Sequence, residues 1–500
     1  MIRPAPPGAA MRQRSLRPAL WRLIPVALLV GLALSGCADP PTPSREARLD
    51  HEAIADAIGA PIEMHHDHTD HRLHTGSYAM EQVAWSTLDV ALGENGFANL
   101  VLWDDPAGGT LAFVAIDGDR RGGFTIADVT DPRNVRVLGS YRADGSGFQE
   151  VRVTPDGRFA VLNVQRIPDA PQLASPDLAA DCSACLHVVN VEDRGRPRLV
   201  SVLPVELLGS HNMEFHAHDD GLHLYYVGQP LLGTNPDPAG NRVGVARLVE
   251  DGRGGAHLVP VGTFAHDTTG DAGRSFPHDV TVALHPLTGQ RVAYVSHWEG
   301  GLVTFDVSQA GRLPVLPELG RHAEAAPSDV LALHWAVQEE AVRADGRVIA
   351  WSAPEIASLA TGTGVIRSYD VSDPARPVQL GTWQLPGTLA IEGRFLLSPH
   401  VAVPDQQTGL LAVAHYHAGV WILDVSDPAQ PRHLAYHLPH GDPASPYDGP
   451  VWWKKPNFSP DGFGPNVYMA RWHDGLLWVT DRGTGLYALR YTGPVPGPVT

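Results

Sequence analysis

Several short motifs that mark common enzyme classes are missing from the 500 residues of this chain. It has no GxSxG, no glycine-rich phosphate loop and no HExxH, which removes those classes from consideration. Basic charge is also scarce. The formal net charge is −18, and residues 1–36 hold five arginines and no acid, so the remainder carries −18 − 5 = −23. A nucleic-acid partner requires a basic stripe, and we expect none here.

The apolar run near the N-terminus, Leu23–Leu34, is too short to cross a bilayer as a helix. It follows an arginine-rich region, as in a secretory signal peptide that spans residues 1–36. The next residues, Leu34-Ser35-Gly36-Cys37, resemble the lipobox of bacterial lipoproteins. The resemblance implies cleavage before Cys37, lipid on this cysteine, and a cell-envelope location at the outer membrane or cell surface. The alternative is a plain secretory signal with an incidental cysteine.

Replacing Cys37 with serine is expected to abolish lipid attachment, because the thiol that would carry the lipid is lost. The Cys37→Ser protein should lose the label from a fatty-acid probe and leave the membrane fraction. Unchanged membrane attachment would contradict the prediction.

Residues 37–76 are expected to form a tether between the anchor and the folded domain. Residues 38–48 are polar and rich in proline, and apolar spacing within 45–60 indicates one short helix. A histidine tract follows, which either binds Zn²⁺, Cu²⁺ or Ni²⁺ loosely or is a solvated linker without a metal. The histidines of this tract are His65, His66, His68, His71 and His74.

A unit of three short strands recurs along the chain, and its clearest copy runs from Phe276 to Ser308. β-Branched and aromatic runs separated by turn residues, without helical spacing, predict antiparallel strands. The third strand of each unit ends at positions that are 54 to 65 residues apart. These positions are Asp128, Asn190, Leu248, Asp306, Asp370, Asp424 and Leu489. Seven copies predict an all-β fold, a single β-propeller of seven blades with four antiparallel strands each.

A pair of β-sandwiches is the alternative fold, but it does not explain one period across most of the chain. We expect residues 77–493 to form the propeller and residues 494–500 a C-terminal tail. The strand-like run from Tyr78 to Val90 is expected to be the outer strand that closes the last blade onto the first.

Three copies of the repeat end in DVTDP or DVSDP, at Asp128, Asp370 and Asp424. With this motif the chain resembles the LVIVD-repeat β-propeller proteins over most of residues 95–493. The aspartate and proline set a tight turn before the outermost strand, so the motif is structural and not catalytic. The resemblance implies an exported or surface-anchored protein.

One blade, from Pro277-His278-Asp279 to Ser308, also resembles the selenium-binding protein and methanethiol oxidase family of propellers. That resemblance implies a histidine-bound copper site and oxidation of small thiols. Because only one blade matches, the resemblance implies a metal-ligand role for His278 alone.

A second periodic column of polar residues lies near the start of the first strand of successive blades. It consists of Glu150, Glu214, His278, His334, His400 and Asn466. Equivalent residues of a propeller face one axis, so three imidazoles and two carboxylates would converge on one divalent metal, Cu or Zn. His211, His216 and His218 could supply further ligands or supporting contacts. The alternative is a water-filled polar channel without a metal.

Only two cysteines remain after Cys37, and they form the CxxC of Cys182 and Cys185. In an exported chain this spacing favours a small-loop disulfide over a redox-active pair or half of a zinc site. Mass spectrometry of non-reduced peptides should show the pair two hydrogens lighter than a dithiol. A free dithiol in freshly secreted protein would argue against the disulfide.

Two functions remain open on the sequence alone. The first is a lipid-anchored, cell-envelope binding or scaffold module that recognises an unknown protein or small molecule. The second is a metal-dependent oxidoreductase with its histidine site in the propeller channel. Converging imidazoles in the structure would favour the second, and scattered histidines the first. In either case we expect a monomer.

Overall fold

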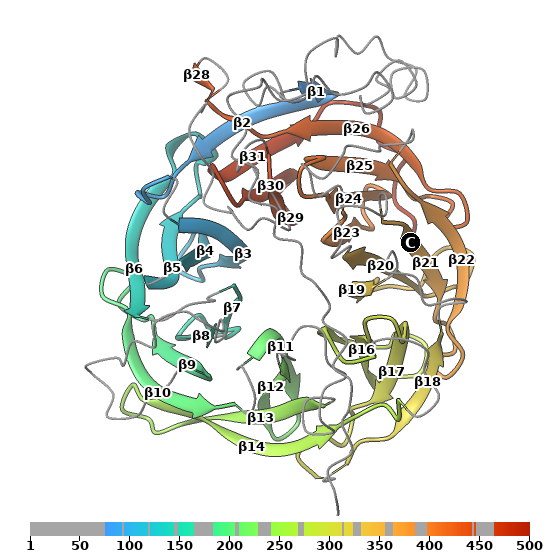
Figure 1. Cartoon of the computed structure of the whole chain (residues 1–500), viewed down its shortest axis with the longest axis horizontal. Coiled ribbons are helices and arrows are strands. Elements are labelled where there is room, and N and C mark those ends of the chain that lie inside the picture. Colours follow the sequence, from blue (N-terminus) through green and yellow to red (C-terminus); the bar gives the residue numbers. More distant parts are fainter. Residues whose placement is uncertain are drawn as a thin grey trace, which may run out of the picture. The chain divides into compact units, whose positions relative to one another are not determined.

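Sheets of antiparallel strands follow one another along the chain, as the repeat predicts. The computed structural model describes residues 76–92, 95–118, 121–144, 149–164, 184–205, 210–228, 242–268, 275–312, 315–323, 332–355, 364–385, 398–442, 445–446 and 465–500. They all belong to one compact unit, Ser44–Thr500. Seven sheets in a ring make this unit a seven-bladed β-propeller, which confirms the predicted fold class (Figure 1).

The first four blades each contain four consecutive strands. Blade one consists of β3 (Asn95–Asp104), β4 (Thr110–Gly118), β5 (Arg121–Asp128) and β6 (Arg136–Asp144), with a short 3₁₀ turn, η2 (Pro132–Asn134), before β6. Blade two consists of β7 (Val151–Val153), β8 (Phe159–Val164), β9 (Cys185–Asn190) and β10 (Arg198–Pro204). Blade three consists of β11 (Ser210–His218), β12 (Gly221–Gly228), β13 (Val243–Glu250) and β14 (Ala256–Phe264). Blade four consists of β15 (Asp279–Leu284), β16 (Arg291–Ser296), β17 (Leu302–Asp306) and β18 (Glu318–His322).

Blade five is built in the same way, whereas blades six and seven each receive a strand from the N-terminal segment. Blade five consists of β19 (Ala332–Gln338), β20 (Ile349–Glu355), β21 (Ile366–Asp370) and β22 (Val378–Trp383). Blade six consists of β23 (Val401–Asp405), β24 (Leu410–Ala414), β25 (Val420–Asp424) and β26 (Arg432–Leu438), followed by the small hairpin β27 (Gly441–Asp442) and β28 (Ser445–Pro446). Blade seven takes only β29 (Val467–His473), β30 (Leu476–Asp481) and β31 (Gly485–Tyr491) from the C-terminal part.

The N-terminal segment closes the ring. Strand β2 (Met80–Ser86) pairs with β31 as the outer strand of blade seven, at the position that the sequence predicts. Strand β1 (Gly76–Tyr78) pairs with β26 and adds a fifth strand to blade six. One continuous segment therefore ties two neighbouring blades together before blade one begins (Figure 1).

The aspartates of the DVSDP motif act as turn caps. The Oδ1 atoms of Asp128, Asp370 and Asp424 accept hydrogen bonds from the backbone N–H two residues later, at 2.9 to 3.1 Å. Asp306 and Asn190 do the same in two copies that lack the full motif. The motif therefore shapes the turn before the outer strand, as expected for a structural signature.

The middle strands of the blades form the apolar core. Every residue of β4, β8 and β9 is buried, because neighbouring blades cover both faces of these strands. The outer strand β10 is only partly buried along its length. Within the described part of the chain, no helix has the length and apolar character needed to span a membrane.

Several sequence predictions fall outside the described residues. They concern Cys37, Cys182, the possible helix within 45–60 and the histidine tract. Cys185, at the start of β9, is disulfide-bonded. Its pairing with Cys182 stays a prediction.

Candidate metal centre at the propeller axis

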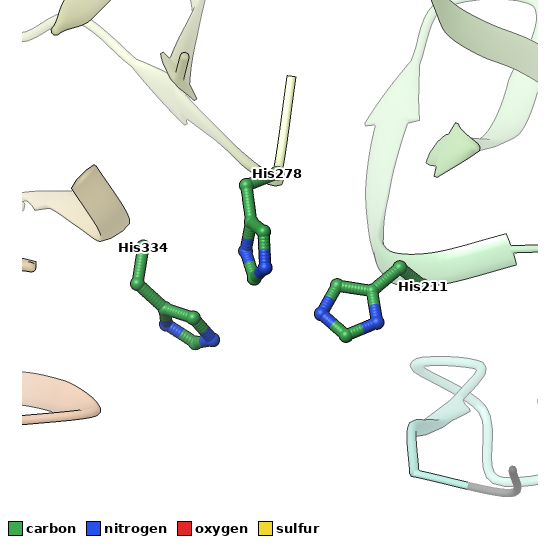
Figure 2. A group of neighbouring side chains, drawn as sticks. All are labelled: His211, His278 and His334. Carbon is green, nitrogen blue, oxygen red and sulfur yellow. The ribbon is translucent and has the colours of Figure 1, made fainter. Parts of the chain in front are cut away.

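The inner strands of blades three to six bring four histidines together near the propeller axis. His211 lies in β11 and His334 in β19, while His278 and His400 immediately precede β15 and β23. Figure 2 shows the rings of His211, His278 and His334 turned toward one space. Together with Glu355, the last residue of β20, these four residues are called the axial cluster below.

The imidazoles of the axial cluster form a continuous row. Ring centroids are 4.4 Å apart for His211 and His278, 4.6 Å for His278 and His334, and 4.0 Å for His334 and His400. Ligand atoms of His211, His278 and His334 lie within 4.8 Å of one another. Those of His334, Glu355 and His400 meet the same limit. His334 belongs to both groups and is therefore the centre of the arrangement.

Glu355 adds a carboxylate to this row of imidazoles. Its Oε2 lies 3.8 Å from Nε2 of His278 and 4.0 Å from Nε2 of His334. Its Oε1 accepts a hydrogen bond of 2.6 Å from the hydroxyl of Tyr416. Tyr416 therefore fixes one carboxylate oxygen and leaves the other directed at the imidazoles.

Irregularities in two inner strands direct their histidines to the axis. The pairing of β11 with β12 shifts register between Ser210 and Met213, a stretch that contains His211. The pairing of β19 with β20 shifts between Leu333 and Trp335, on either side of His334. A β-bulge turns the affected side chain away from its regular alternation, and such bulges are common beside active sites.

Burial keeps these histidines neutral. It lowers the pKa of His211 to about 4 and that of His334 to about 3. The pKa values of His278 and His400 lie well below the usual value for the same reason, and neighbouring imidazoles lower them further. Neutral imidazole is the form that binds a metal ion.

The ring nitrogen that does not bind a metal determines, through its own hydrogen bond, which nitrogen is free to act as a ligand. Nδ1 of His400 donates a hydrogen bond of 2.6 Å to the carbonyl of Tyr468, so Nε2 carries the lone pair. Such an outer contact is the usual way to fix the tautomer of a ligand histidine. Nδ1 of His278 and Nδ1 of His334 are buried, and these two rings face the backbone of the next axial histidine, at His334 and His400 respectively. The Nε2 atoms of both rings face Oε2 of Glu355.

Two aromatic residues in the left-handed backbone region support the cluster. Trp298 has φ 43° and Tyr416 has φ 40°, and each follows a histidine in equivalent turns of blades four and six. Trp298 stacks on His278 with ring centroids 4.5 Å apart, and Tyr416 lies 5.1 Å from His400. Such a backbone conformation costs on the order of 1–3 kcal/mol and tends to occur at functional sites.

Backbone hydrogen bonds hold both turns in place. The carbonyl of Trp298 accepts from the N–H of Leu333 at 3.0 Å, and Tyr416 exchanges two such bonds with Val467. Each turn is therefore attached to the inner strand of the next blade. The attachment fixes the aromatic ring against its histidine.

The two other residues of the predicted set lie in a different cluster. Oε2 of Glu150 is 2.6 Å from Nη1 of Arg152, and Oε2 of Glu214 is 3.2 Å from Nε of the same arginine. Burial raises the pKa of Glu150 to about 7, and Arg152 opposes this rise. Of the predicted residues, the structure thus brings His278, His334 and His400 together, whereas Glu150 and Glu214 bind Arg152.

Sequence reasoning gave His211 only a secondary role and missed Glu355. The spacing of the column selected Glu214 in blade three, whereas the bulge in β11 directs His211 to the axis. The HNMEFHAH segment was the available signal for His211. Nothing in the sequence around Glu355 marks it, because it ends a second strand and not a first.

Comparisons with known proteins add little. No family model matches the chain, and no curated protein matches it. Among solved structures, the chain is similar to the crystal structure of Chaetomium thermophilum Raptor, with 13% sequence identity and a TM-score of 0.46. The match covers 84% of this chain and 30% of that chain. A similarity of this size supports no inference about activity or partners.

Proposed function

We propose that this protein is a transition-metal-dependent oxidoreductase with its metal centre in the axial cluster. The observation that carries the proposal is the convergence of His211, His278 and His334, whose ligand atoms lie within 4.8 Å of one another. Three neutral imidazoles suit Cu²⁺ or Zn²⁺, the metals that the ligand types also favour on sequence grounds.

The residues of the axial cluster would have different roles in metal binding. Nε2 of His278 and Nε2 of His334 both face Oε2 of Glu355, so these two nitrogens would hold the ion. His211 completes a set of three nitrogens. Glu355 and His400 provide the alternative set around His334, and Tyr416 orients the carboxylate of Glu355.

The surroundings favour redox chemistry over hydrolysis. Trp298, Tyr416 and Tyr468 are buried and pack against the imidazoles, and Tyr468 lies with its ring centroid 3.9 Å from that of His400. An apolar, aromatic shell limits water access and tunes the reduction potential of a metal. Copper, when bound, would supply one-electron chemistry. Glu355 and Tyr416 form a hydrogen-bonded pair that can hold or pass a proton beside the centre.

The cellular setting of this activity rests on the sequence. The lipobox-like segment before Cys37 and the LVIVD-type repeats support an exported protein attached to the cell envelope. If the axial cluster binds no metal, the alternative of a binding or scaffold module at the same location is the better proposal.

Elemental analysis of a full chain with the five tract histidines replaced by glutamine tests the proposal. The replacement prevents the histidine tract from contributing bound metal. We expect bound copper or zinc that survives gel filtration and depends on the axial cluster. An electron paramagnetic resonance signal that disappears on reduction would support the redox role. Zinc alone would keep the metal centre but contradict the oxidoreductase. A metal-free protein would overturn the proposal.

A further inference from the structure

A second group of histidines lies at the other end of β11. The segment HAHDDGLH forms the hairpin of β11 and β12, and it contains His216, His218 and His223. His218 is seven residues from His211 along the strand, which corresponds to about 23 Å of extended chain. This group is therefore separate from the axial cluster.

The hairpin register places the three histidines on one face. His216 lies directly opposite His223, and His218 lies opposite Gly221. Residues two apart on a strand share a face, and directly opposite residues have Cβ atoms about 5 Å apart. Ring centroids are 5.5 Å apart for His216 and His218, and 4.5 Å apart for His218 and His223. The backbone alone thus holds three imidazoles within a small volume.

His223 is the unusual member of this group. Its side chain is fully buried; the ring contacts the backbone of Gly221, and its Nε2 has no hydrogen-bond partner among the described residues. A carboxylate oxygen of Asp220 lies 3.8 Å from its Nε2, which is too far for a hydrogen bond. A buried ring nitrogen without a hydrogen bond is destabilising unless something else contacts it.

The turn of blade four borders Nε2 of His223 and the carboxylate of Asp220. The turn of blade four approaches through Gly311, where a Cβ atom would lie 3.1 Å from Nε2 of His223 and 3.0 Å from Oδ2 of Asp220. Glycine at position 311, which has φ 80°, keeps a Cβ atom from crowding these two groups. Nε2 of His218 is hydrogen-bonded to the hydroxyl of Tyr225 at 2.8 Å, an outer contact of the kind that orients ligand histidines.

Charge near the hairpin is balanced. Arg291 binds Asp219 at 3.1 Å, and Arg247 lies 3.7 Å from Asp220. Burial lowers the pKa of His216 to about 4 and that of His218 to about 3, so both rings are neutral near pH 7. The donor set is thus three neutral imidazoles and one carboxylate, which borderline divalent metals accept in four-coordinate sites.

We propose that His216, His218 and His223, together with Asp220, bind a second transition-metal ion of the zinc and copper type. Rotation of the side chains brings one nitrogen of each ring to the metal, while the hairpin register keeps their Cβ atoms in place. The ion takes Nε2 of His223 as a ligand and fastens the hairpin near the turn of blade four. Binding to the folded state alone stabilises the protein by mass action.

Zinc titration of the full chain with the tract histidines replaced by glutamine tests this second site. We expect two equivalents of tightly bound Zn²⁺. The His223→Gln change should remove the equivalent at the hairpin and leave the equivalent at the axial cluster. The double change His278→Ala with His334→Ala should do the opposite. His257→Gln, at an exposed position of β14, is the matched control and should change nothing.

The outcomes separate the two sites. Two equivalents in the His223→Gln protein, or a single equivalent that is lost with His278 and His334, would overturn the second site only. A single equivalent that is lost with His223 would overturn the axial centre only. Asp220→Asn and His216→Gln lie at less buried positions and replace His223→Gln in the test if that variant fails to fold. Each of them must lower the affinity for the second equivalent of zinc. Unchanged affinity in both would also reject the proposal.

Discussion

Replacing both His278 and His334 with alanine is expected to abolish metal binding at the propeller axis. The two changes remove two of three ligands from the first group and the shared ligand from the second. Neither remaining group then has three donors, and two isolated donors do not hold a divalent ion tightly. Elemental analysis and zinc or copper titration of the chain without tract histidines measure the loss.

Graded variants show whether the effect follows the geometry. Tyr416→Phe removes only the hydrogen bond to Glu355, so we expect the metal affinity to fall by about 10- to 100-fold, as for other outer contacts of metal sites. The exposed His257→Ala change should leave the affinity as it is. Circular dichroism confirms that each variant is folded. A folded double variant that binds as many equivalents of metal as the parent would contradict the axial centre.

The second large effect is expected for Glu339→Gln, which should destabilise the propeller by about 3–5 kcal/mol. Glu339 and Arg343 form a buried ion pair, with side chains 1% and 3% exposed. Their two hydrogen bonds are 2.6 and 2.8 Å long. Glu339 also accepts from Nε1 of Trp351 at 2.8 Å and from Gln406 at 3.2 Å. Glutamine keeps the shape but leaves the guanidinium of Arg343 buried without its counter-charge.

The position of this ion pair explains why its loss is severe. Nη1 of Arg343 donates to the carbonyl of Val425 in blade six, whereas Glu339 follows the inner strand of blade five. The pair therefore joins two blades. Urea unfolding followed by tryptophan fluorescence measures the change in stability.

An exposed ion pair provides the control for that experiment. Asp373 and Arg376 are 2.7 Å apart, but their side chains are 47% and 81% exposed. Surface pairs contribute little, so Asp373→Asn should leave the stability within the error of the measurement. Equal effects of Glu339→Gln and Asp373→Asn would show that burial does not govern the contribution of the pair.

The strained aromatic turns connect the fold to the proposed chemistry. Trp298 and Tyr416 occupy equivalent positions in blades four and six, and both contact an axial histidine. The repeat of the fold thus produces two related supports for one centre. Only these two blades carry the histidine-aromatic-x-x-Gly pattern within the described residues, in line with a site on one side of the axis.

The sequence by itself determined the architecture, because each blade is a local unit. Strand alternation, turn residues and the DVSDP caps act within about 60 residues, and they repeat often enough to count seven blades. The closing strand was also predictable, since blade seven lacks an outer strand of its own. The spacing of His278, His334 and His400 likewise placed them on adjacent blades.

Only the tertiary structure decided the composition of the axial cluster. His211 enters it through a bulge, which shifts side chains off the regular period. Glu355 enters from the end of a second strand, and Tyr416 holds it across blades. Glu150 and Glu214 bind Arg152 instead, and the buried carboxylate of Glu150 in particular requires a cation beside it. Contacts between blades and departures from strand regularity have no local signature, so spacing alone could not reveal them.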